Sequence, residues 1–227
     1  LHLSIRRQRQ MCIRDSPDRI RNGLERRAIL RVFRDARDEI DEFLGTKERD
    51  IQKLDLSNTQ DNFDIKGISE ALRQMKKIFK QMNIWYKKKQ SDLVKSGKKD
   101  LKVPTIEFIG EIDSILNEDL DAKIDGNYTM LKKMIKQLYR VKVEQDEDGD
   151  EKETASTRLA DMLEISLEYL HNPALVLVFD LLGEEGRVRS FLLDPGVVSG
   201  PILTNTSGAI LMSGTLFPPE MYSDLLQ

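Results

Sequence analysis

The chain has 227 residues, of which 39% are hydrophobic and 33% are charged, and its formal net charge is −3. This length fits one or two domains, and the composition is that of a folded, charge-rich chain rather than a disordered one. No apolar run is long enough to cross a bilayer, and no secretory signal is visible. Cys12 is the only cysteine, which excludes an internal disulfide and a metal site built from cysteines. We therefore expect an intracellular protein.

The first sixteen residues, LHLSIRRQRQMCIRDS, do not fit the pattern of the rest of the chain. They contain four arginines and little hydrophobic periodicity, and the run MCIRDS is typical of translated sequencing-adapter DNA. The alternative is a genuine basic tail. We interpret residues 1–16 as a non-native tail and leave them out of the fold prediction.

Apolar residues at helical spacing predict a first helix from Pro17 to about Leu44, with Gly45 as its stop. Residues 46–63 are polar and predict an irregular segment, with at most a short amphipathic turn near Ile51 and Leu54. The strongest helix signal covers residues 64–93, where apolar residues, Trp85 among them, recur every three or four positions.

Further helices follow a predicted basic loop at 96–102. One opens at Pro104 and runs to residue 116, one covers 127–143, and one covers 157–170. The run EQDEDGDEKE at 144–153 predicts an exposed acidic loop between the last two.

The pattern then changes from helix to strand. Two runs rich in β-branched residues flank Gly183–Gly186 and predict a β-hairpin over residues 174–193. Residues 208–212 predict a buried strand, and Pro218-Pro219 predict the start of a helix after the turn Ser213-Gly214-Thr215. The predicted fold class is α+β: a mostly helical domain with a hairpin, followed by the start of an α/β domain.

Charge is strongly segregated along the chain. Residues 66–102 carry twelve Lys or Arg and three acids, whereas residues 144–153 carry seven acids and one lysine. Lysines neutralise phosphates and aromatic faces stack on bases, so this pattern indicates a possible nucleic-acid surface. Trp85 falls on the apolar stripe and is assigned to the core. The DNA-binding candidates are Tyr86, Lys87, Lys88, Lys89, Lys132 and Lys136. The competing interpretation is a solvated face with no ligand.

No complete catalytic or metal site is visible in the sequence. The two histidines, His2 and His171, have no partners for a metal site or a catalytic triad, and no phosphate-binding loop is present. Ser213 and Thr215 follow a predicted strand, where hydroxyls can bind a nucleotide phosphate or a metal-holding carboxylate. The alternative is that these hydroxyls only form hydrogen bonds with backbone groups in a tight turn.

Three segments together resemble the XPD-type DNA repair helicases of superfamily 2, most closely the archaeal forms. They are PDRIRNGL (17–24), SFLLDPGVVSGPI (190–202) and ILMSGTLFPPEMYSDLL (210–226). In that family the first follows the Walker B box, the second returns from a helical insertion called the Arch domain, and the third is motif III. The order and spacing agree, and a long helical stretch lies between the first segment and the second.

The resemblance implies a domain plan. Residues 17–30 would end the post-Walker B segment of the first motor domain, 31–195 would form the Arch-like domain, and 196–227 would be the truncated motif III strand, turn and helix. Ser213, Gly214, Thr215 and Leu216 would couple ATP hydrolysis to movement on DNA. The Arch-like domain would guide single-stranded DNA at a fork and could dock repair-complex proteins, in the cytoplasm or nucleoid of an archaeon-like cell.

The resemblance also implies a parent enzyme, an ATP-dependent DNA helicase of 5′-to-3′ polarity acting in nucleotide excision repair. Its ATP, Mg²⁺ and [4Fe–4S] cluster would be bound outside the residues present here. Met11 to Ser16 stand where the family has its acidic box, and the Walker A loop, cluster cysteines and second motor domain are absent. We therefore expect the chain alone to be inactive, with no complete catalytic residue set.

Two alternatives stay open. A non-enzymatic helical protein-interaction module would bind proteins and show no salt-dependent affinity for DNA. A related helicase of replication or of the bacterial damage response would share motif III, although the PDRIR run argues against it.

Overall fold

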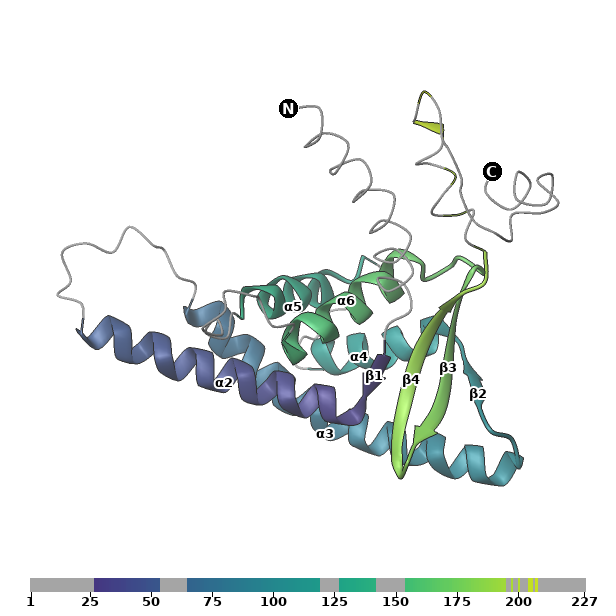
Figure 1. Ribbon diagram of the computed structural model, residues 1–227. Helices are drawn as coiled ribbons and strands as arrows, with labels where there is room; N and C mark the ends of the chain where they lie inside the picture. Colours follow the sequence, from purple (N-terminus) through teal and green to yellow (C-terminus); the bar gives the residue numbers. More distant parts are fainter. Residues whose placement is uncertain are drawn as a thin grey trace, which may run out of the picture.

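The computed structural model describes residues 27–53, 65–118, 127–141 and 154–194, together with single positions between 197 and 207. Figure 1 shows a layer of helices beside one antiparallel sheet, so the class is α+β. The elements in chain order are β1 (Arg27–Ile29), α2 (Leu30–Lys53), α3 (Ile65–Ser96), β2 (Leu101–Val103), α4 (Thr105–Asn117), α5 (Thr129–Arg140), α6 (Ala155–Glu168), β3 (Leu175–Leu182) and β4 (Glu185–Leu192).

The predicted hairpin is confirmed and forms the centre of a four-stranded sheet. Strands β3 and β4 pair from Leu175↔Leu192 to Leu182↔Glu185, and Gly183 takes a positive φ of 63° in the two-residue turn between them. The sheet order is β1-β4-β3-β2, so two short strands flank the hairpin.

The flanking strands correct two predictions. Arg27–Ile29 was expected to be helical and Leu101–Lys102 to lie in a loop, but both segments pair with the hairpin. Each strand has three residues, which is too short to show the alternation by which a strand is recognised. Their conformation is set by partners 70 or more positions away in the chain, namely Arg187 to Arg189 for β1 and Leu177 to Phe179 for β2.

The first helix starts later and ends later than the sequence predicts. Helix α2 begins at Leu30 and continues through Gly45 to Lys53, so Gly45 does not stop it. A glycine inside a helix costs about 1 kcal/mol relative to alanine. Helix α2 tolerates this cost because Phe33, Ala36 and Ile40 are buried, and the helix packs along both α3 and α6.

The prediction of a helix at 64–93 is confirmed as α3. The helix closes at Gly97, whose φ is 65° and whose N–H donates to the carbonyl of Val94 at 3.2 Å. The predicted helices at 104–116, 127–143 and 157–170 are confirmed as α4, α5 and α6, with ends that shift by one to three residues. The acidic run 144–153, the interval 54–64, and residues 1–26 and 208–227 lie outside the described elements.

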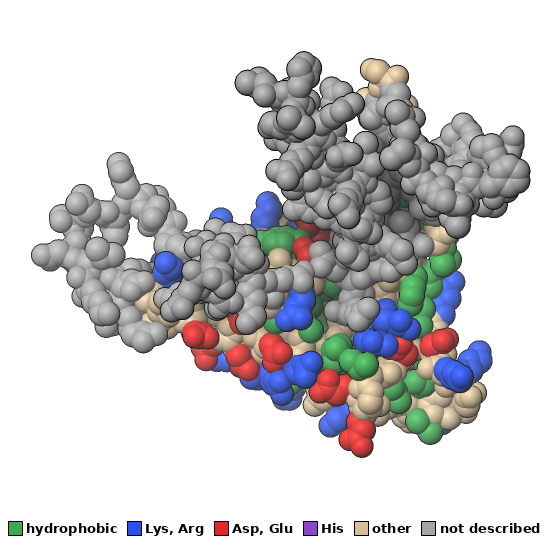
Figure 2. Space-filling view, viewed as in Figure 1, with side chains coloured by type: hydrophobic (Ala, Val, Ile, Leu, Met, Phe, Trp, Pro, Cys, Tyr) green, Lys and Arg blue, Asp and Glu red, His purple; other side chains and the backbone are tan. Residues whose placement is uncertain are grey.

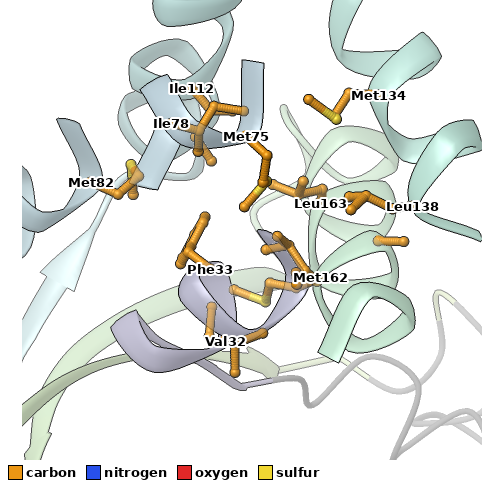
Figure 3. Close-up of a cluster of buried hydrophobic side chains, with 14 of the residues drawn as sticks. Val32, Phe33, Met75, Ile78, Met82, Ile112, Met134, Leu138, Met162 and Leu163 are labelled. Carbon is orange, nitrogen blue, oxygen red and sulfur yellow. The ribbon is translucent and has the colours of Figure 1, made fainter. Parts of the chain in front are cut away.

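Side chains from all five helices meet in one core. Figure 3 shows Phe33 of α2, Met75 of α3, Ile112 of α4, Met134 of α5 and Leu163 of α6 converging on the same interior, and each is at most 2% exposed. Burial of this apolar surface is the main source of stability.

Helix α6 is anchored to α2 by a carboxylate. Glu39 accepts hydrogen bonds from the backbone N–H groups of Ala155 at 2.8 Å and Ser156 at 2.7 Å, and from the Ser156 hydroxyl at 2.7 Å. These N–H groups belong to the first turn of α6, where no intrahelical acceptor exists.

Among the described helices, none is long and apolar enough to span a membrane.

An ionic cluster joins the two central strands on the sheet face that points away from the helices. Arg187 donates two hydrogen bonds of 2.8 Å to Asp180, and Arg189 approaches the same carboxylate at 2.7 Å. Burial alone would raise the pKa of Asp180, but the hydrogen bond from Arg187 and the charge of Arg189 outweigh it and lower that pKa.

We predict that Asp180→Asn destabilises the chain by about 2 kcal/mol at pH 7, because it leaves two shielded guanidinium groups without their counter-charge. The folded-state pKa of Asp180 is depressed, so its stabilisation is present above the unfolded pKa of about 3.9 and is lost as pH falls through the folded pKa. Urea unfolding at several pH values should therefore show the difference between wild type and variant shrinking below about pH 4. A difference that is independent of pH would contradict this ionic role.

Candidate nucleic-acid interface

Helix α3 carries the largest net positive charge of the described elements, with nine Lys or Arg and two acidic residues. The helix buries Ile68, Met75, Met82 and Trp85 on one side. Basic residues follow the opposite side at helical spacing, and we call this set the α3 cationic face: Lys66, Arg73, Lys76, Lys77, Lys80, Lys87, Lys88 and Lys95. At 1.5 Å per residue the set spans about 44 Å.

Most of this charge is not neutralised locally. Arg73 pairs with Glu70, at 2.7 Å between Nη2 and Oε1. Within the described residues, no ion pair is formed by Lys76, Lys80, Lys87 or Lys88. Unpaired ammonium groups on one face produce a positive potential that attracts polyanions. By contrast, acidic and basic side chains are mixed over α2 on the face seen in Figure 2.

The structure corrects the assignment of Tyr86. Its ring is 2% exposed and packs edge-on against Phe33 and Phe179, with centroids 6.1 and 5.7 Å away. Its hydroxyl donates to the carbonyl of Ala28 at 2.6 Å, and burial raises the pKa of this phenol. A ring in this position has no free face for a base, so the expected stacking role of Tyr86 is wrong for this fold.

Two adjacent aromatic residues are buried because α3 is covered from two sides. Trp85 contacts Phe108 of α4 and Phe179 of β3, at centroid distances of 5.8 and 6.2 Å. Tyr86, one position on, faces α2 and β4. Neighbouring positions of a helix point about 100° apart, so both can be buried only where two different partners meet the same turn. The prediction that Trp85 lies in the core is confirmed, with 5% of it exposed.

The three consecutive lysines have different environments. Lys87 and Lys88 are exposed. The Lys89 ammonium lies 2.6 Å from the Glu107 carboxylate and 5.3 Å from the centre of the Trp85 ring, and its side chain is 16% exposed. Lys89 therefore links α3 to α4 through an ion pair, and Glu107 neutralises the charge that a ligand would need.

A small groove of about 250 Å³ lies beside Lys87, between α3, the start of α2 and the hairpin turn. Arg31 and Arg34 line it, and sequence reasoning did not select them. No signal in the predicted first helix shows that its beginning would lie against α3. Both arginines approach Asp35, at 3.9 and 3.0 Å, and Glu184 and Glu185 form the far wall. The groove is thus close to neutral, and the α3 cationic face remains the stronger candidate.

Lys132 and Lys136 are exposed, as the amphipathic pattern of α5 predicts, but they belong to a different surface. They line a groove of about 1050 Å³ between α5 and α6, to which α3 contributes no residue. Glu164 and Glu168 line the same groove from α6. The six DNA-binding candidates are therefore divided: Lys87 and Lys88 on α3, Lys132 and Lys136 in the groove, Lys89 in an ion pair and Tyr86 in the core.

The expected motif III residues, Ser213, Gly214, Thr215 and Leu216, lie outside the described residues. Among the residues that are described, no group of three or more His, Cys, Asp or Glu side chains could hold a metal ion. His171 lies at one end of the large groove and is exposed.

No protein-family model matches the chain, and no curated protein matches it.

We predict that Tyr86→Phe lowers the free energy of unfolding by about 1 kcal/mol, because the variant keeps the ring and loses only the hydrogen bond to Ala28. Urea denaturation measures this change, and the affinity for an oligonucleotide should stay at the wild-type value. Unchanged stability together with weaker DNA binding would show instead that the ring contacts the ligand.

Proposed function

We propose that this chain is the Arch-like domain and the motif III end of the first motor domain of an ATP-dependent DNA helicase of the XPD type. In this proposal the α3 cationic face guides single-stranded DNA. The observation that carries the DNA part is the α3 cationic face, which spans about 44 Å and in which Lys76, Lys80, Lys87 and Lys88 form no ion pair within the described residues. Neutralisation of phosphates by such groups supplies most of non-specific nucleic-acid affinity.

The course of the chain supports an insertion. Strands β1 and β4 are adjacent and antiparallel, and Arg27 is opposite Arg189. The chain therefore enters and leaves the described unit at one place, as a domain inserted into a host must do. The segments that resemble the helicase family, 17–24 and 190–202, flank or overlap these two strands. Because β1 belongs to the same sheet as the hairpin, we propose that the inserted unit starts at Arg27 rather than at residue 31.

The geometry favours contacts to the DNA backbone over contacts to bases. Lysine ammonium groups bind phosphates as point charges and carry no sequence preference. Trp85 and Tyr86, the aromatic residues nearest to Lys87, are both buried and cannot stack on a base. We therefore expect binding that is weak, independent of sequence and strongly dependent on salt, which suits a surface along which a strand slides.

The cofactors of the parent enzyme do not fit the residues present. Four cysteine thiolates hold a [4Fe–4S] cluster, and Cys12 is the only cysteine of this chain. No phosphate-binding loop is present for ATP and Mg²⁺. Ser213 and Thr215 would respond to the nucleotide bound elsewhere in the parent, so hydrolysis is assigned to the parent and not to this chain.

We predict that the full chain binds a fluorescein-labelled single-stranded oligonucleotide and that binding weakens as salt increases. Anisotropy titrations at several salt concentrations measure the slope of log K against log salt. Lys87→Ala together with Lys88→Ala should lower the affinity and reduce the slope by about 1.4, because each phosphate contact of a single strand contributes about 0.7.

The matched control is Lys132→Ala together with Lys136→Ala, which removes the same number of exposed lysines from α5. All these proteins keep residues 1–16, so any contribution of the four arginines there cancels in the comparison. The absence of binding at low salt would contradict the DNA function. An equal loss in the control would contradict the assignment to α3.

The family assignment has a separate test. We predict that long-read sequencing of the source DNA shows a D-E-A-H-N box directly before the codon of Pro17, with a Walker A loop and four cysteines upstream. A native start that reads LHLSIRRQRQMCIRDS would contradict the helicase assignment and favour the interaction module.

A further inference from the structure

The groove between α5 and α6 has the shape and charge of a docking site for a helix. The start of α5 (Asn127, Tyr128) and the end of α6 (Leu170 to Pro173) line the same groove, while Tyr139 at the other end of α5 bonds to the middle of α6. The two helices are therefore antiparallel. From Tyr128 to Tyr139 the groove is about 17 Å long, which corresponds to three helical turns.

The floor of this α5/α6 groove is apolar. Ile135 is 5% exposed, and Leu167 and Leu170 are half-buried and belong to the margin of the core. Tyr128 and Tyr139 are also half-buried and line the same groove. An apolar floor of this length accommodates the apolar side of an amphipathic helix.

The two rims carry opposite charges. Lys132 and Lys136 form one rim on α5, and Glu164 and Glu168 form the other on α6. All four side chains are exposed, and in the part of the chain that the structure describes no ion pair joins the two rims. Each pair is spaced by four residues, so each rim presents its charges about 6 Å apart along a helix axis.

The acidic rim is held in position. The Tyr139 hydroxyl lies 2.7 Å from Glu164 Oε2 and 2.7 Å from Asp161 Oδ1. A phenol has one proton to donate, so it fixes Glu164 without neutralising it. This groove does not suit a nucleic acid, because Glu164 and Glu168 on the α6 rim would repel its phosphates.

We propose that the α5/α6 groove docks an amphipathic helical segment of a partner protein that is acidic along one flank and basic along the other. Acidic side chains of the partner at i and i+4 face Lys132 and Lys136, and basic side chains at the same spacing face Glu164 and Glu168. Apolar partner residues at i, i+3 and i+7 lie on Ile135, Leu167 and Leu170. The resulting three-helix packing covers an apolar surface and pairs four charges that the described structure leaves open.

This proposal is independent of the DNA function because it uses other residues on other helices. A partner helix on α5 and α6 and a DNA strand on the α3 cationic face would both be held by helices that share one hydrophobic core. The domain would then couple the position of a partner protein to the DNA path.

The test uses the full chain and three synthetic peptides of 15 residues with the same apolar face. One peptide has an acidic flank and a basic flank, one has two acidic flanks, and one has two basic flanks. Anisotropy of the labelled peptides should show that the two-signed peptide binds about five-fold or more tightly than either other peptide, since exposed ion pairs contribute up to about 1 kcal/mol each.

The charge reversal Lys132→Glu with Lys136→Glu gives the decisive comparison. The reversed protein has two acidic rims, so its preference should change to the peptide with two basic flanks. Both positions are exposed, and urea denaturation verifies that the fold is kept. Lys87→Glu with Lys88→Glu is the matched control and should leave all three peptide affinities unchanged.

Failure to prefer the two-signed peptide, or a preference that does not change with the reversed rim, would overturn the docking proposal. Neither result bears on DNA binding, which the alanine double variants at the same two pairs of positions address in the oligonucleotide assay. The two proposals can therefore fail separately.

Discussion

The packing of Tyr86 is the constraint on which the arrangement of the two layers depends. Its hydroxyl bonds to Ala28 in β1, and its ring packs against Phe33 of α2 and Phe179 of β3. The same contact requires glycine at position 186, where an added Cβ would lie 2.7 Å from the Phe179 ring and 3.0 Å from Tyr86. One side chain thus joins an edge strand, two helices and the hairpin, and it fixes where α3 crosses the sheet.

The position of α3 then decides which charges are available. With α2 on one side and the sheet and α4 on the other, the remaining face of α3 carries the unpaired lysines. Lys89 points toward α4 and pairs with Glu107, although it is next to two free lysines in sequence. A net charge of −3 therefore coexists with a strongly cationic surface, because the charges are sorted by helix face rather than averaged over the molecule.

The two recognition modes that we propose rest on a contrast between the two basic surfaces. On α3 the cations face solvent without opposing acids, which suits a polyanion. On α5 the lysines face glutamates across an apolar floor, which suits a helix with two flanks of opposite charge. The sequence places six candidates in one class, since each is a basic or aromatic residue in a charged helix. Only the packing shows that they belong to four different environments.

The sequence by itself determined the local features. Helices α3 to α6, the closing Gly97, the hairpin and the burial of Trp85 all follow from periodicity, turn chemistry and apolar spacing, which act within a few residues. The tertiary structure alone decided the strands β1 and β2, the continuation of α2 through Gly45, the burial of Tyr86 and the groove between α5 and α6. Each of these features results from partners that are distant in sequence. Contacts with such partners stabilise a segment without producing a periodic hydrophobic pattern in the sequence of that segment.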